Sequence, residues 1–313
     1  MISFRYLVVT IVSIFLALGL GILAGTTIID QSLVKNLREN TASAERARDK
    51  ALHRSTDLTS VLGLLVPRVI DGRLAHRQIV LVTDDNTDGG AVGQVRTVLT
   101  QARADLVAEL HVTGSLAPSS TAKAALAQLL INDGEPASGN LSRAAALDLA
   151  NRLATGPPAA DVRTGKQAQH DLLADLLSGG FLDFPHTTPP KPQAVGGAGQ
   201  VVVVVAGGGS DPAVPFDDFM LPFVEQLIAR QVAVAVAEPQ VTAQSFVGMV
   251  RHDGAVASSG DLVTVDDLST DDPAGGVALV LGLREMLRSP GVGGNYGVKT
   301  GATGLIPATS AQP

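Results

Sequence analysis

The first thirty residues contain the strongest constraint on how this chain can fold. Tyr6 to Ile29 is a run of 24 residues without a charge, set between Arg5 and Asp30. As an α-helix this run would extend about 36 Å, which is enough to cross a hydrocarbon core of about 30 Å. A cleavable signal peptide is the alternative, but its apolar region is usually shorter and ends in an A-x-A-like site, and no such site precedes Asp30. The sequence therefore predicts an uncleaved transmembrane anchor over residues 1–30.

Small residues form a stripe within this apolar run. Ala17, Gly21 and Gly25 follow one another at intervals of four. This spacing lets two helices approach closely in a bilayer, yet small residues are common in membrane helices, so both interpretations stay open. The membrane side is open as well. Basic residues lie on both sides of the run, with Lys35 and Arg38 soon after it, so the positive-inside rule does not select an exported C-terminal part.

A second helical pattern begins directly after the anchor. Apolar and small residues recur there at alternating intervals of four and three, which is the period of a coiled-coil seam. Asn40 lies on this seam, where a lone polar residue can fix the register of a parallel dimer. The alternative is a single amphipathic helix that lies on its own domain, with Arg54 solvated. We predict a stalk helix over residues 31–70 that pairs with itself or a partner helix and is ended by Pro67. The seam consists of Leu33, Leu37, Asn40, Ala44, Ala47, Ala51, Arg54, Leu58, Val61 and Leu65.

The residues from 75 to 290 alternate between strand-like and helix-like segments. Val201–Val205 is five consecutive valines, as expected of a strand buried on both faces. Strands alternating with helices predict a mostly parallel, three-layer, Rossmann-like α/β sheet. Residues 291–313 are rich in glycine, and we expect a flexible tail there. The expected strands are 78–83, 105–112, 201–205, 232–237 and a short one at 255–258, and the expected helices are 91–103, 121–132, 141–154, 166–177, 222–230, 242–251 and 273–288.

Composition excludes several classes of site. The 313 residues include no cysteine, which excludes disulfides, zinc–thiolate and iron–sulfur sites and a cysteine nucleophile. The net charge is −7, from 23 basic and 30 acidic residues without a basic cluster. Nucleic-acid binding needs a concentrated positive surface, so we do not expect a nucleic-acid partner.

Motifs that would carry chemistry are weak. The glycine-rich residues 206–210 follow the valine strand as a phosphate loop would, but neither a Walker A nor a G-x-G-x-x-G pattern is present, so a flexible turn is the simpler interpretation. Aspartates at 84–88 would lie at the carboxyl end of the first strand, and aspartates at 266–272 would lie before the last helix. Ligands bind at the carboxyl ends of strands in such sheets, and clustered carboxylates could hold a hard cation. They lack EF-hand spacing, and turn formation and helix capping explain them more simply. There is also no G-x-S-x-G elbow, and we predict no enzyme.

The six histidines are scattered, and only one local pair suggests a soft metal. Met249 and His252 lie three residues apart on one expected helical face, which gives a thioether and an imidazole of the kind that copper prefers. One such pair among four methionines and six histidines is more simply explained by chance. We therefore predict no certain cofactor from the residues themselves.

Four stretches carry a resemblance to a known family. They are the opening MISFRYLVVTIVSIFLALGLGILAGTTI with the helix that follows it, VVVVVAGGGS, TVDDLSTDDPAGGVALVLGL and the closing YGVKTGATGLIP. With these stretches the chain resembles the mycobacterial copper transport protein B (MctB) family of actinobacteria. The resemblance implies a cell-envelope protein of copper efflux and copper tolerance, proposed to act as an outer-membrane pore, with an exported C-terminal domain and copper as the ligand.

The residues themselves favour a second interpretation. One hydrophobic helix cannot line a wide channel. The rest of the sequence lacks the successive ten-residue segments of alternating apolar and polar residues that build a membrane barrel. No residues of the types that bind copper cluster in the sequence. The alternative is a membrane-anchored coiled-coil scaffold that docks cell-envelope or division-machinery partners, with no direct metal transport.

Overall fold

The computed structural model describes residues 4–117, 121–133, 139–158, 170–185, 191–257 and 259–308. The side chains of 4, 24–34, 36, 37, 55, 58, 59, 132 and 133 lie outside this description. The chain divides into two compact units, Met1–Ser60 and Val61–Pro313.

The long N-terminal helix α1 extends over Phe4–Ile70 and contains both the predicted anchor and the predicted stalk. Its segment Arg5–Leu23 is long and apolar enough to cross a membrane, and none of this segment is buried inside the protein. Pro67 does not end the helix as expected, because the helical backbone continues to Ile70 and the Asp71 N–H donates to the Pro67 carbonyl at 2.9 Å. A proline inside a helix removes a hydrogen bond and crowds the preceding turn, but the core packing of Val66 and Ile70 holds the helical turn around it here.

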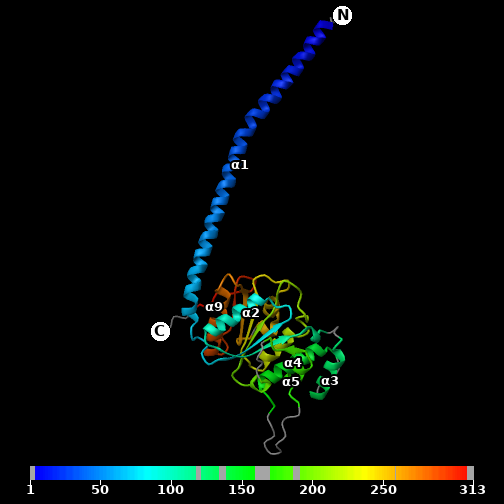
Figure 1. Cartoon of the computed structure of the whole chain (residues 1–313), viewed down its shortest axis with the longest axis vertical. Helices are drawn as coiled ribbons and strands as arrows, with labels where there is room; N and C mark the ends of the chain where they lie inside the picture. Colours follow the sequence, from blue (N-terminus) through cyan, green and yellow to red (C-terminus); the bar gives the residue numbers. More distant parts are fainter. Residues whose placement is uncertain are drawn as a thin grey trace, which may run out of the picture. The chain divides into compact units, whose positions relative to one another are not determined.

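The second unit is built on a seven-stranded sheet with the order β3-β2-β1-β4-β5-β6-β7. Figure 1 shows this sheet with helices packed around it. Every neighbouring pair is parallel except β2 and β3, which are antiparallel. This arrangement confirms the predicted mostly parallel α/β class. The strands are β1 (Gln78–Asp84), β2 (Asp105–Val112), β3 (Leu182–Asp183), β4 (Val201–Val205), β5 (Val234–Pro239), β6 (Leu262–Leu268) and β7 (Gly294–Tyr296).

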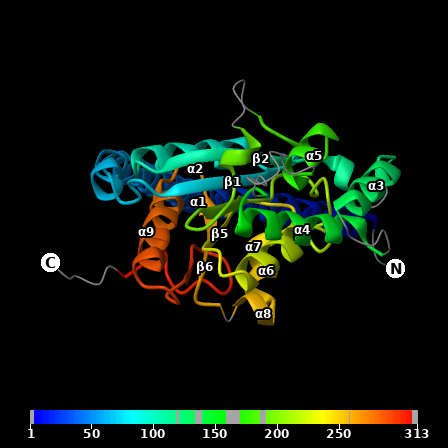
Figure 2. The same cartoon turned by 90° about the horizontal axis from the view of Figure 1, so that it is seen from below.

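Helices cover both faces of the sheet and make three layers (Figure 2). Alternate residues of one strand enter different cores: Val80 and Val82 of β1 pack with α3 to α7, whereas Ile79 and Leu81 pack with α2 and α9. The helices are α2 (Gly89–Gln101), α3 (Lys123–Asp133), α4 (Leu141–Thr155), α5 (Leu172–Ser178), α6 (Met220–Ala229), α7 (Phe246–His252), α8 (Gly254–Ala257) and α9 (Ala274–Arg288), with short 3₁₀ turns at Gly114–Leu116 and Pro192–Ala194.

The valine strand behaves as the sequence predicts. All five residues of β4 are buried, and they divide between the two cores, with Val202 and Val204 on one face and Val201, Val203 and Val205 on the other. β4 therefore lies at the centre of the sheet, between β1 and β5.

Two expectations near the C-terminus are wrong, and one strand was not expected. Residues 254–257 form the helix α8 rather than a strand, and the strand lies further on, in β6. Part of the expected tail is the edge strand β7, whose residues pair with Val263 to Val265. Glycine permits this pairing because a Cβ atom at Gly293 would overlap the carbonyl oxygen of Leu262. In β6 the adjacent Asp266 and Asp267 hid the strand signal, since aspartate is rare in strands.

The last turns of α1 belong to the core of the second unit. Val66 and Ile70, with Leu74 just beyond the helix, lie in the same buried cluster as α2 and α9. Ile70 is fully buried and Leu74 is 1% exposed. The packed domain therefore begins inside α1.

This packing predicts that Ile70→Ala destabilises the domain. Removing a fully buried isoleucine side chain costs about 2–5 kcal/mol, because it leaves a cavity as well as losing apolar burial. Arg68→Ala, two residues away and exposed, is the control and should stay within about 0.5 kcal/mol of the wild type. Urea denaturation followed by circular dichroism measures both. Equal midpoints for Ile70→Ala and the wild type would show that the helix end is not part of the core.

Candidate functional site

The topology of the sheet indicates where a ligand would bind. The chain leaves β1 toward β2 on one side and later returns as β4 on the other side of β1. The loops that follow β1 and β4 therefore run in opposite directions, and open α/β sheets bind ligands in the crevice that such a reversal creates.

The two loops at this reversal are bonded to each other. The Asp88 N–H donates to the Gly207 carbonyl at 3.1 Å, and the Asn86 side-chain amide donates to the Asp211 carbonyl at 2.7 Å. A Cβ atom at Gly208 would overlap the carbonyl oxygen of Asn86. Gly208 therefore makes room for the neighbouring loop of the same chain.

The aspartates after β1 serve the turn, as predicted. One carboxylate oxygen of Asp84 accepts the Asn86 N–H at 3.1 Å and the Thr87 hydroxyl at 2.6 Å. Asp88 accepts the Ala91 N–H at 2.8 Å and caps α2. Asp84 is buried, and this burial raises the pKa of its carboxyl group.

A short chain of polar side chains links β1 to β2 beside this turn. The two nitrogens of His111 lie 3.0 Å from the Thr83 hydroxyl and 2.8 Å from an Asp85 carboxylate oxygen. The other oxygen of Asp85 accepts the Gly114 N–H at 2.7 Å. Thr83 is 2% exposed, so this chain of bonds ends inside the sheet and ties the loop after β1 to the loop after β2.

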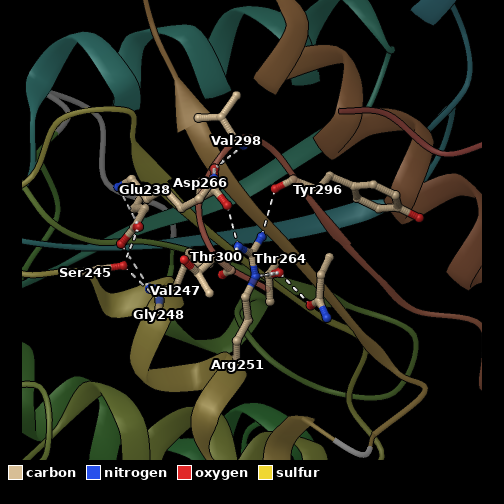
Figure 3. Close-up of polar contacts among 12 residues, drawn as sticks. Glu238, Ser245, Val247, Gly248, Arg251, Thr264, Asp266, Tyr296, Val298 and Thr300 are labelled. Carbon is tan, nitrogen blue, oxygen red and sulfur yellow. Dashed lines mark hydrogen bonds and ion pairs between the residues drawn. The ribbon is translucent and has the colours of Figure 1, made fainter. Parts of the chain in front are cut away.

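A larger cluster of buried charges lies at the same edge of the sheet, beyond β5 and β6 (Figure 3). Arg251 of α7 forms an ion pair with Asp266 of β6, and the two side chains are 3% and 0% exposed. The guanidinium also donates to the Thr264 hydroxyl at 2.8 Å and to the Tyr296 carbonyl at 2.9 Å. Arg251 thus joins a helix, a strand and the C-terminal segment, which we define as residues 294–308.

A second ion pair completes the cluster. The Lys299 ammonium lies 2.8 Å from a carboxylate oxygen of Glu238, which is fully buried at the end of β5. Glu238 also accepts the Ser245 hydroxyl at 2.7 Å and the Val247 N–H at 3.0 Å. The carboxylate is therefore bonded by the start of α7 and by the C-terminal segment together.

Backbone groups of the C-terminal segment close around Asp266. Its carboxylate accepts the Val298 N–H at 2.7 Å and the Lys299 N–H at 3.0 Å. Gly297 has a φ of 123°, and a Cβ atom there would overlap the Asp266 carboxylate. The arrangement fixes the C-terminal segment over the carboxyl ends of β5 and β6.

Sequence reasoning missed Arg251, Glu238 and Lys299. The partners of each lie far away along the chain, so no local pattern marks them. The only available signal was that two of the stretches carrying the family resemblance contain Asp266 and Lys299.

Asp267 differs from its neighbour because its carboxylate is not fully bonded. It is 7% exposed, and its Oδ1 atom is buried without a hydrogen-bond partner in the part of the chain that the structure describes. Burial, together with the charges of Asp266 and Asp272, raises the pKa of Asp267 to about 6.

The predicted soft-metal pair lies on α7. Met249 packs partly buried against the core, and exposed His252 has its Nδ1 atom 2.6 Å from the Gly248 carbonyl. Within the described ranges, no group of three or more His, Cys, Asp or Glu residues is arranged to hold a metal ion. A role for Met249 and His252 in binding copper therefore stays a prediction.

The predicted helix contacts of α1 also stay predictions. Ala17, Gly21, Asn40, Val61 and Leu65 are exposed. The other seam residues with described side chains are exposed as well, namely Ala44, Ala47, Ala51 and Arg54. The side chains of Gly25, Leu33, Leu37 and Leu58 lie outside the described residues.

Comparison with known proteins adds one finding. A family model described as copper transport outer membrane protein, MctB, matches residues 1–307 of the chain. A search of curated proteins gives no match.

The buried Arg251–Asp266 pair predicts a large loss of stability in Arg251→Met. This variant leaves the Asp266 carboxylate buried without its cation, which costs about 3–5 kcal/mol. Arg103→Gln is the control, because its pair with Asp71 is exposed on both sides and such pairs contribute about 0–1 kcal/mol. Chemical denaturation of both variants is the measurement. If the free energy of unfolding falls by the same small amount in both variants, the charge cluster does not hold the domain together.

The raised pKa of Asp267 predicts a pH dependence of stability. Between its ordinary value of 3.8 and about 6, the folded state binds the proton more tightly than the unfolded state. Stability is therefore lost as the pH rises through this window. Asp267→Asn removes the titration, so the stability of the variant relative to the wild type should be higher at pH 7.5 than at pH 4.5.

Thermal or urea denaturation at the two pH values measures this difference. Asp105→Asn is a matched control, because Asp105 is exposed at the start of β2 and its replacement should change stability by less than about 0.5 kcal/mol. A variant-minus-wild-type difference that is the same at both pH values for Asp267→Asn would contradict the prediction.

Proposed function

The chain belongs to the MctB family of copper transport outer membrane proteins, and from this premise we propose that it supports copper export as a membrane-anchored envelope protein. In this proposal the α/β domain engages protein partners, performs no catalysis and does not hold copper in a preformed site. The observation that carries the proposal is the position of the C-terminal segment, which covers the carboxyl ends of β5 and β6 with its own Lys299 and backbone amides.

The side chains available for binding metal support the proposal that the domain has no preformed copper site. Copper is bound in proteins mostly by thiolate, thioether and imidazole ligands. The chain has no cysteine, four methionines and six histidines. Met249 and His252 supply a thioether and an imidazole on one short helix, but Met249 is engaged with the core. Two such groups would bind copper weakly without further ligands.

The N-terminal helix supports an anchoring role. In the described part of the chain, Arg5–Leu23 is the one segment long and apolar enough to cross a membrane. A single helix satisfies its own backbone but encloses no channel. Passage of copper through this protein would therefore require several copies or a separate partner. We further propose that residues 1–30 remain attached and that the domain is exported, in keeping with an outer-membrane family.

The proposal predicts which variants restore copper tolerance to a host that lacks its own copy. The full chain should restore growth in copper, and the double variant Met249→Leu with His252→Ala should do so equally, because neither side chain is needed to hold the metal. A protein without residues 1–30 should not restore growth, because the domain is then no longer fixed to the membrane. Growth in a copper series, with immunoblots for protein amount, is the measurement.

Calorimetry with Cu(I) under reducing conditions gives the control. We expect no stoichiometric site of nanomolar affinity in the purified protein. Such a site, lost in His252→Ala together with copper tolerance, would refute the proposal and identify a copper-binding protein. The mass of the protein isolated from membranes tests the anchor, because a cleaved leader would leave the N-terminal residues missing.

A further inference from the structure

The last turns of α1 are apolar almost all the way around. We define residues 61–70 as the stalk base. Apolar side chains occupy seven of these ten positions, namely Val61, Leu62, Leu64, Leu65, Val66, Val69 and Ile70. A helix that is apolar on every side is normally buried on every side.

Only one side of the stalk base is covered by its own domain. Val66 and Ile70 are 8% and 0% exposed and lie in the core cluster with α2 and α9. The other apolar side chains remain between 41% and 76% exposed: Val61, Leu62, Leu64, Leu65 and Val69. The domain therefore accounts for one face of the stalk base and leaves the other face uncovered.

The uncovered face coincides with the coiled-coil seam. With Leu33 counted as a d position, Val61 also falls at d and Leu65 at a. The flanking e and g positions are occupied by Leu62, Leu64 and Val69. These are the positions through which paired helices meet. Val66 and Ile70, which face the domain, take b and f positions, so the helix can bind its own domain and a second helix at the same time.

We propose that this uncovered face binds the stalk base of a second copy of this chain, with the two helices parallel and in register. The membrane-length segment of α1 would place two copies at the same height and in the same orientation, which raises their effective concentration for parallel pairing. Asn40 would then face Asn40 of the other copy, as a register-fixing polar pair does. Arg54 and Arg68 lie on the same seam and limit the apolar section at its two ends.

This inference goes beyond the proposed function and does not rest on it. It depends on the exposed apolar side chains of residues 61–69 and on the heptad register. Neither of these two observations involves copper binding or copper tolerance. The helix-pairing proposal can therefore fail while the proposed function holds, and the reverse is also possible.

Cysteine crosslinking of the full chain in its membrane tests the proposal. The wild type has no cysteine, so every disulfide-linked species arises from the introduced residue. Val61→Cys and Leu65→Cys should form a covalent dimer under mild oxidation, because a and d side chains of parallel helices meet across the seam within disulfide range. Ser60→Cys is the matched control, one residue away at an outward c position. We expect at least about tenfold less dimer from it, because c positions point away from the seam.

A second variant separates association from folding. Leu65→Glu added to Val61→Cys should abolish the crosslink by placing charges in the seam, while the circular dichroism of the protein stays unchanged because Leu65 is exposed. Equal crosslinking at residues 60, 61 and 65 would overturn the proposal. So would an adduct whose mass is that of a different protein, or no crosslink at either seam position.

Discussion

The structure depends on the burial of both faces of a parallel sheet. Each face of β4 carries valine only, so neither face can be left to water. Helices α3 to α8 contribute to the core on one face, but the other face has α2 and α9 and needs an additional apolar surface. The end of α1 supplies it through Val66 and Ile70. One helix is thereby used for two purposes, since its first turns have the length and composition for a bilayer and its last turns complete a core.

The second requirement is to close the edge where the parallel strands end. In many α/β proteins a ligand does this and provides the function. Here the chain does it with its own groups, through the loop contacts of Asn86 and Gly208 and through the charge cluster around Asp266. Function is then expected on outer surfaces and along α1, which is where a protein that works by association in an envelope would carry it.

The sequence predicted the parts of this fold that local patterns encode. The strands β1 and β4 contain continuous apolar runs, and the turn and capping roles of Asp84 and Asp88 follow from aspartate at the end of a strand. β6 could not be predicted in this way, because Asp266 is buried only by virtue of Arg251 from α7 and amides from beyond residue 297. When the burial of a strand residue depends on partners far away in the sequence, the strand shows no periodic pattern of apolar residues. For the same reason the Gly-rich sequence of β7 resembled a tail.

The position of the C-terminal segment has a consequence for how the domain unfolds. Asp266 and Glu238 obtain backbone and ammonium donors from residues 298 and 299, which lie far from them along the chain. A state in which this segment has come away would leave carboxylates buried without part of their bonding, which is unfavourable. Release of the segment and loss of the sheet edge are therefore coupled, so this part of the domain should open as one cooperative unit rather than fray residue by residue.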